Sequence, residues 1–213
     1  IKTLGGDDLL MPTCIADNMN YAQTHPEVSI ITSNLQEIDA NSTIIRETVS
    51  NEGLKYFLST QNEIGSRKAY SRWPAFLNTP TFFCKKELFP IILQCDDDFK
   101  IYEDMSAVFR IIEHDITIHY MDKTTIKYRI HPNAISRNPL AEARREQEAY
   151  IIFNKFRKKN LSIFNPIDLS IYYETWLRFK YKGLFGYKGI NILRKFSLFY
   201  WQLRLNGYKE FWI

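Results

Sequence analysis

The stretch from Met105 to Ile130 constrains the fold most, because its apolar pattern changes from a helical to a strand-like period. Apolar residues recur at i, i+3, i+4 and i+7 from Met105 to Ile112, which predicts a helix that buries one face. Residues 116–120 and 126–130 then alternate apolar with polar side chains. This alternation predicts two half-buried strands joined by a tight connection at 121–123. We therefore expect an α/β protein.

Further elements are predicted on both sides of this stretch. Residues 28–32 and 81–84 read as short strands, 36–51 as loop or an edge strand, and 61–80 as loop. Helices are expected at Pro12–Thr24, at 139–158, from Asp168 as the capping residue to about Lys182, and at 190–205. The apolar side of the helix at 139–158 consists of Ala149, Ile152, Phe153 and Phe156.

The charge of the chain is unevenly distributed. The first fifty residues hold seven acidic and two basic side chains, whereas residues 177–213 hold eight basic side chains and the single acid Glu210. Fourteen aromatic residues are interleaved with the basic ones from Tyr172 onward. This pattern is typical of a helix in an anionic membrane interface, or of a packed helical subdomain whose basic side chains reach water. No nucleic-acid recognition module is legible.

Cysteine usage suggests a cytosolic protein. Cys14, Cys84 and Cys95 are odd in number and fit no metal or redox spacing, so we expect buried, reduced thiols. No signal peptide is visible, and no apolar run approaches the roughly 20 residues of a spanning helix. Ile1–Leu4 resembles the end of a buried strand. We therefore expect this sequence to be the later part of a longer protein.

The segment Leu4–Pro12 combines two glycines with two adjacent carboxylates, Asp7 and Asp8. Glycines let a ligand approach the main chain, and carboxylates are preferred ligands of Mg2+ or Mn2+, the ions that usually carry a diphosphate. The alternative is a surface turn in which Asp8 lies near a helix start. The residues alone leave both interpretations open.

Two other groups of polar residues are candidates for a site. Glu103 and Asp104 open the helix predicted after Tyr102, where the helix dipole favours carboxylates by ~0.3–1 kcal/mol, which alone can explain them. Lys127, Arg129 and His131 alternate along a strand and share one face. They can meet a diphosphate, or they can form the polar outer face of an edge strand.

Four stretches, taken in this order, resemble the family 2 glycosyltransferases, specifically the bacterial members that build capsules, O-antigens and related surface polysaccharides. Leu4–Pro12 resembles the metal-binding acidic motif of that family, and Thr79–Lys86 resembles the segment that leads into the acceptor half. Tyr102–Asp104 with its helix resembles the Glu-Asp motif, and Met121–Ser136 resembles the strand that ends the catalytic domain. The resemblance covers about residues 1 to 137.

The resemblance implies a fold and a set of roles. Residues 1–138 would be the acceptor-side part of a GT-A-like domain, a mixed sheet flanked by helices, and 139–213 a helical, basic and aromatic tail. Asp104 would be the catalytic base of an inverting transfer, and Glu103 would contact the acceptor. The remaining roles are a divalent metal, Mn2+ or Mg2+, on Asp7 and Asp8, and the donor diphosphate beside Arg129 and His131.

The sequence departs from the family pattern in two ways. Gly5 stands where the family often has Asp or Glu, which leaves fewer oxygens for a metal. The family's amino-terminal half, which holds the nucleotide base, is absent, so we expect poor donor binding unless another polypeptide supplies it. The expected partners are a nucleotide-diphosphate sugar and a glycan or lipid-linked acceptor, at the inner face of the cell membrane.

Two other functions compete with glycosyl transfer. One is a non-catalytic GT-A-like module that docks on glycan, membrane or a partner, which Gly5 and the absent front half favour. The other is a nucleotidyltransferase of related fold, which the Glu-Asp helix and the Tyr-Arg-x-His strand argue against. If the chain is a transferase, Asp7, Asp104 and the Arg129–His131 strand end should face one cleft.

Overall fold

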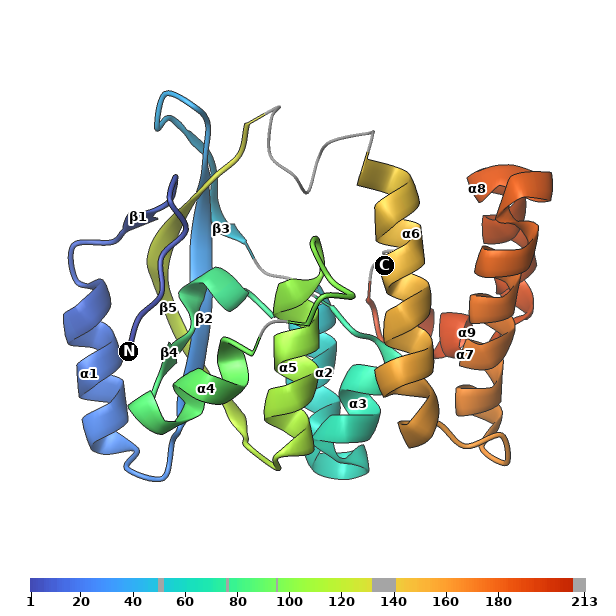
Figure 1. The fold of residues 1–213 in the computed structure, drawn as a ribbon, viewed down its shortest axis with the longest axis horizontal. Coiled ribbons are helices and arrows are strands. Elements are labelled where there is room, and N and C mark those ends of the chain that lie inside the picture. Colours follow the sequence, from blue (N-terminus) through green and yellow to red (C-terminus); the bar gives the residue numbers. More distant parts are fainter. Residues whose placement is uncertain (50–51, 76, 95, 132–140, 209–213) are drawn as a thin grey trace.

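The computed structural model describes residues 1–49, 52–75, 77–94, 96–131 and 141–208, and it has an α/β fold. Within these ranges one mixed sheet has the order β1 (Leu9–Leu10), β5 (Ile118–Arg129), β2 (Ile30–Ile38), β3 (Ile44–Val49), and β4 (Phe83–Cys84) also pairs with β2. The pairing of β2 with β5 is parallel, and the other pairings are antiparallel. This confirms the predicted fold class and the edge strand in 36–51 (Figure 1).

The predicted hairpin at 116–130 is wrong, because β5 is one continuous strand. Met121 pairs with Ser33 and Thr124 with Asn34, so two more residues of β5 than of β2 lie between these pairs. The extra residues are Asp122 and Lys123, whose side chains are exposed. A bulge therefore accommodates the polar pair that suggested a turn.

Helices cover both faces of the sheet (Figure 1). On one side lies α1 (Cys14–Thr24), and on the other lie α2 (Glu52–Ile64), α3 (Ser66–Arg72), α4 (Phe89–Ile92) and α5 (Glu103–Glu113). Adjacent residues of β2 point to opposite sides: Ile30 packs in the core with α5, whereas Ile31 packs in the smaller cluster beside α1. This arrangement makes the sheet the middle layer of the fold.

Two expectations for these helices need correction. The loop predicted at 61–80 contains the end of α2 and all of α3, which are separated by Gly65 at a φ of 82°. Glycine adopts a positive φ without the steric cost that a Cβ brings, so Gly65 marks the break between the two helices. In α1, the helical spacing of Ile15, Met19 and Ala22 predicts that these residues form the buried face. Ile15 and Met19 are exposed, and Cys14 and Asn18 are buried instead.

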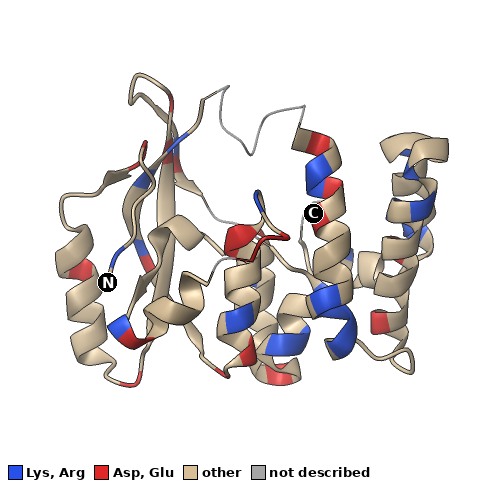
Figure 2. Cartoon of the chain, in the orientation of Figure 1, with Lys and Arg blue, Asp and Glu red and all other residues tan. Residues whose placement is uncertain are grey.

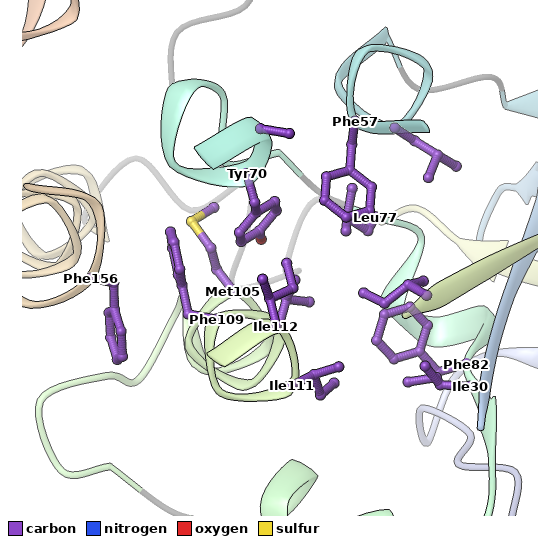
Figure 3. Packing of buried hydrophobic residues seen from close by; sticks show 14 of the residues in the cluster. Ile30, Phe57, Tyr70, Leu77, Phe82, Met105, Phe109, Ile111, Ile112 and Phe156 are labelled. Atoms are coloured by element: carbon purple, nitrogen blue, oxygen red, sulfur yellow. The ribbon is translucent and has the colours of Figure 1, made fainter. Parts of the chain in front are cut away.

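The main core lies between the sheet and α6 (Glu142–Ile152), and Figure 3 shows its packing. Phe109 of α5 and Phe156 stack with ring centroids 5.0 Å apart and planes at 9°. Tyr70 of α3 packs against the other side of this pair, 4.6 Å from Phe109. Ala149, Ile152, Phe153 and Phe156 are all buried, which confirms the predicted apolar face.

The chain beyond α6 is helical and packs beside it (Figure 1). Its elements are a π-helical turn at Phe153–Arg157, a 3-10 turn at Lys158–Asn160, α7 (Pro166–Trp176), a second π-helical turn at Leu177–Tyr181, α8 (Lys182–Leu193), a second 3-10 turn at Arg194–Phe196 and α9 (Leu198–Leu205). Among the described residues none of these helices combines the length and apolar character that crossing a membrane requires. The helix predicted at 190–205 is not continuous, because the 3-10 turn and Ser197 separate α8 from α9.

The prediction that Asp168 caps α7 is wrong, because Asn165 takes the capping position ahead of Pro166. The Asn165 side chain accepts hydrogen bonds from the N–H groups of Ile167 and Asp168. Asp168 is fully buried and lies 2.7 Å from Arg72 and 3.1 Å from Lys68, both on α3. This buried ion pair joins α7 to the body of the protein.

The prediction of buried thiols is confirmed for two cysteines, Cys14 and Cys84. Cys95 lies outside the described residues, as does the predicted boundary at 138.

Candidate functional site

The pairing of β1 with β5 brings together Asp7, Asp8, Arg129 and His131, which we call the Asp7 cluster. Leu9 pairs with Lys127 in antiparallel register, so the two aspartates lie beside the end of β5. Asp8 Oδ1 accepts a hydrogen bond from the main-chain N–H of Arg129 at 2.9 Å, and His131 Nε2 lies 3.0 Å from Asp7 Oδ2.

Arg129 uses its guanidinium to join three segments of the chain. Its Nε donates to the carbonyl of Asp7 at 2.8 Å, and its Nη1 donates to the carbonyls of Asp39 and Ala40 at 2.7 and 3.0 Å. Its Nη2 donates to Ser42 Oγ at 3.0 Å. The Arg129 side chain therefore holds the β2–β3 turn against the loop that carries the aspartates.

Gly5 leaves room for both carboxylates of the Asp7 cluster. A Cβ at this position would lie 2.8 Å from Asp8 Oδ2 and 3.6 Å from Asp7 Oδ1. Burial raises the pKa of Asp8, and the nearby Asp7 carboxylate adds to this rise, against the N–H of Arg129. Asp8 Oδ2 and Asp7 Oδ1 thus both lie beside Gly5, and a cation bound to them would offset the free-energy cost of the partly buried Asp8 charge.

The donor set fits a divalent ion that is shared with a phosphate-bearing ligand. Mg2+ typically takes one or two carboxylates and completes its shell with water and phosphate oxygens. In the part of the chain that the structure describes, no group of three or more His, Cys, Asp or Glu side chains is placed to hold a metal ion. Among the described residues, Asp7 and Asp8 are the side chains that could hold such an ion.

The second predicted group, Glu103 and Asp104, opens α5 and lines a cleft of about 560 Å3, which we call the acidic cleft. Asp104 Oδ2 accepts a hydrogen bond from Thr79 Oγ1 at 3.0 Å, and Asp104 Oδ1 accepts from the N–H of Met105 at 2.7 Å. The walls also include the apolar side chains Phe82, Phe89, Ile92, Leu93 and Phe99. Figure 2 shows the acidic end of α5.

Two of the carboxyl groups that line the acidic cleft, those of Glu103 and Asp104, are harder to ionise than usual. Burial raises the pKa of Asp104 above its ordinary 3.8, although Thr79 and the N–H of Met105 stabilise the carboxylate. The pKa of Glu103 is also raised, first by burial and then by the negative charge of Asp104. A carboxylate with a raised pKa that faces a cleft is a better proton acceptor near neutral pH.

The sequence did not indicate the role of Glu148, which holds the loop at 100–102 directly before α5. Glu148 lies on α6, is fully buried and accepts hydrogen bonds at 2.9 Å from the N–H groups of Lys100, Ile101 and Tyr102. Arg144 pairs with it at 2.6 Å. A signal was present, because Glu148 is a carboxylate four residues before the core residue Ile152 on a helix with an apolar face.

The Asp7 cluster and the acidic cleft both lie toward the carboxyl ends of β2 and β5, but at different positions along the strands. Because α5 leads directly into β5 and runs antiparallel to it, Asp104 lies toward the carboxyl ends of β2 and β5, where α/β proteins bind ligands (Figure 1). Asn78, beside Thr79, donates to the carbonyl of Ser33, whereas Arg129 pairs with Ile38. The five residue steps along β2 from Ser33 to Ile38 correspond to about 17 Å.

The structure therefore brings Asp7, Asp8, Arg129 and His131 together and places Glu103 and Asp104 in a separate cleft. This arrangement differs from the single shared cleft that the sequence led us to expect. Neither aspartate of the Asp7 cluster is among the described residues that line the acidic cleft. The end of the fourth motif, from Pro132 to Ser136, lies outside the described residues.

Comparison with models of known protein families finds none that matches the chain, and a search of curated proteins finds no significant relative. The resemblance to the family 2 glycosyltransferases consequently rests on the four motifs.

Proposed function

We propose that this chain is the acceptor-side part of a metal-assisted, inverting glycosyltransferase with a GT-A-like fold. The main support for this proposal is Asp104. Its carboxyl group lies in the first turn of α5, lines the acidic cleft and has a raised pKa. The apolar walls beside Glu103 and Asp104 suit an acceptor that presents a hydroxyl next to an apolar portion, such as a lipid-linked glycan.

The reaction would proceed by a single displacement. Asp104 removes the proton from the acceptor hydroxyl, whose oxygen forms a bond to the anomeric carbon of the donor sugar. The bond from this carbon to the nucleoside diphosphate breaks on the opposite face, so the configuration inverts. Thr79 and the N–H of Met105 hold the Asp104 carboxylate in place, and Glu148 holds the preceding loop.

Asp7 and Asp8 would bind Mg2+ or Mn2+ against the donor diphosphate, and the metal, when bound, would stabilise the charge of the leaving group. His131 orients the Asp7 carboxylate, and Arg129 fixes the loop that carries both aspartates. The diphosphate is bonded to the carbon that the acceptor attacks, so the transfer requires the Asp7 cluster and Asp104 to meet around one donor. The two sites lie about 17 Å apart along β2, and donor binding has to close this separation. We expect a nucleotide-binding segment outside this sequence to complete the donor site.

Substitution of Asp104 tests the proposal in the full-length enzyme. Asp104→Asn keeps both hydrogen bonds possible, because the amide can accept from Met105 and donate to Thr79. General bases typically contribute about 10²–10⁴-fold, so kcat should fall by about that factor while the urea midpoint stays at or above that of wild type. Asp97→Asn, in the same cleft, serves as the control. A kcat near that of wild type in Asp104→Asn would refute the proposal.

A non-catalytic module is the second candidate, and the contacts of Arg129 favour it. The guanidinium predicted to meet the diphosphate already donates to three carbonyls and a hydroxyl within the fold. Calorimetry with Mn2+ and a nucleoside diphosphate separates the two candidates. Metal-dependent binding to the full-length protein supports the transferase, and its absence supports the docking module.

A further inference from the structure

The helix α9 exposes an apolar stripe on the side that faces away from the core. Leu198, Trp201 and Leu205 recur at i, i+3 and i+7 and are 52%, 47% and 84% exposed. The opposite side of α9 is filled by Phe199, Tyr200 and Leu203, which are buried. The helix is therefore apolar on both sides, and only one side has a partner in the described structure.

The stripe continues into the turn that precedes α9. Phe196 is 79% exposed, and the indole N–H of Trp201 donates to the carbonyl of Lys195 at 2.7 Å, so Trp201 lies beside this turn. The turn is anchored from inside, because Glu174 accepts hydrogen bonds from Arg194 and from Ser197. We call Phe196, Leu198, Trp201 and Leu205, with Lys195, the α9 outer face.

The charged residues of the segment that carries this face have one sign. Residues 175–209 contain no Asp or Glu. Three of the basic residues in this stretch are neutralised inside the fold, since Arg178, Lys182 and Arg194 pair with glutamates of α6 and α7. Lys188 and Lys195 form no ion pair with any described residue, and Figure 2 shows the basic residues along this end of the molecule.

We propose that the α9 outer face is a peripheral docking surface for an anionic lipid bilayer. A protein partner would have to present acidic groups beside an apolar patch to match this face. A bilayer of anionic lipid offers both at every point, as negative headgroups above an apolar layer. An aromatic residue such as Trp201, with its N–H already bonded and its ring exposed, suits this boundary. The proposal does not depend on glycosyl transfer.

Flotation of the purified chain with vesicles tests this surface. Wild type should float at low salt with phosphatidylcholine vesicles that contain about 30% phosphatidylglycerol, should stay behind with pure phosphatidylcholine, and should be released by salt. Phe196→Ser/Leu205→Ser should reduce the floated fraction at least about tenfold, because both side chains would enter the apolar layer. Lys195→Glu should weaken flotation in the same direction.

Matched controls place the changes elsewhere on the surface. Ile15→Ser/Ile45→Ser removes two apolar side chains that are 47% and 55% exposed, and Lys86→Glu reverses an exposed charge. These variants should float like wild type, and circular dichroism with urea midpoints should show that every variant is folded. Failure of wild type to float, equal flotation with neutral vesicles, or an equal loss in the controls would overturn the proposal. A dimer that Phe196→Ser/Leu205→Ser dissociates, without flotation, would assign the face to a second copy.

Discussion

Replacement of Glu148 by glutamine should destabilise the protein strongly, because this carboxylate connects α6 to the loop that positions Asp104. Its two oxygens accept four hydrogen bonds, from three main-chain N–H groups and from Arg144. The glutamine amide has one accepting oxygen, and its NH2 group takes the place of the other. In either orientation of the amide two of the four hydrogen bonds are lost, and the NH2 group faces two donors. At ~1.5–3 kcal/mol for each bond to a charged group, the loss of two bonds should reduce the free energy of unfolding by about 3–6 kcal/mol.

The pH dependence of this loss follows from the pKa of Glu148. Burial opposes ionisation, but Arg144 and the three N–H groups outweigh it and hold the pKa below the ordinary 4.5. A lowered pKa in the folded state means that the stabilisation is complete above pH 4.5 and is lost as the pH falls through the folded-state value. The difference between wild type and Glu148→Gln should therefore shrink under acid.

Urea denaturation of both proteins at neutral pH and in acid measures these effects. Glu142→Gln is the matched control, since it lies on the same helix with an exposed side chain and should leave the urea midpoint unchanged. The reasoning would be refuted by a Glu148→Gln variant within about 0.5 kcal/mol of wild type at neutral pH.

Three further variants test the core and the Asp7 cluster. Asp168→Asn should cost about 3–5 kcal/mol in urea denaturation, because it leaves buried cations without their carboxylate; an effect close to zero would contradict the role of this pair. Phe156→Ala should cost about 3–5 kcal/mol by the same measurement, through lost contacts and a cavity at the stacked ring pair, and a change below 1 kcal/mol would show that the core is not packed there. Gly5→Ala should abolish Mn2+-dependent nucleotide binding in calorimetry by displacing the Asp8 carboxylate, whereas Gly6→Ala, whose Cβ meets nothing within 4 Å, should bind normally; equal binding in both would contradict the proposed metal site.

Much of the local structure could be predicted from periodicity. The helix after Tyr102, the apolar face of α6 and the short strand at β4 were predictable because one side of each element is buried against the core. The continuous β5 was not, since a bulge and a turn both place polar residues such as Asp122 and Lys123 between apolar runs. Only the pairing with β2 distinguishes them.

The candidate site was predictable only in part, for a similar reason. Residue types and order indicated Asp7, Asp8, Arg129 and His131, and β1–β5 pairing brings them together. The partners of buried charges are far apart in the chain, as in Arg72 with Asp168, and single-sequence patterns carry no information about such contacts. For that reason Asp168 read as a helix cap and the role of Glu148 was missed.

The pH dependence of kcat/KM tests the central role of Asp104 most directly, because it reports the pKa values of the free enzyme. We predict that activity falls on the acid side with an apparent pKa above 3.8, since burial raises the pKa of Asp104. The residual activity of Asp104→Asn should lack this acid limb. An acid limb that persists unchanged in Asp104→Asn would show that another group is the base.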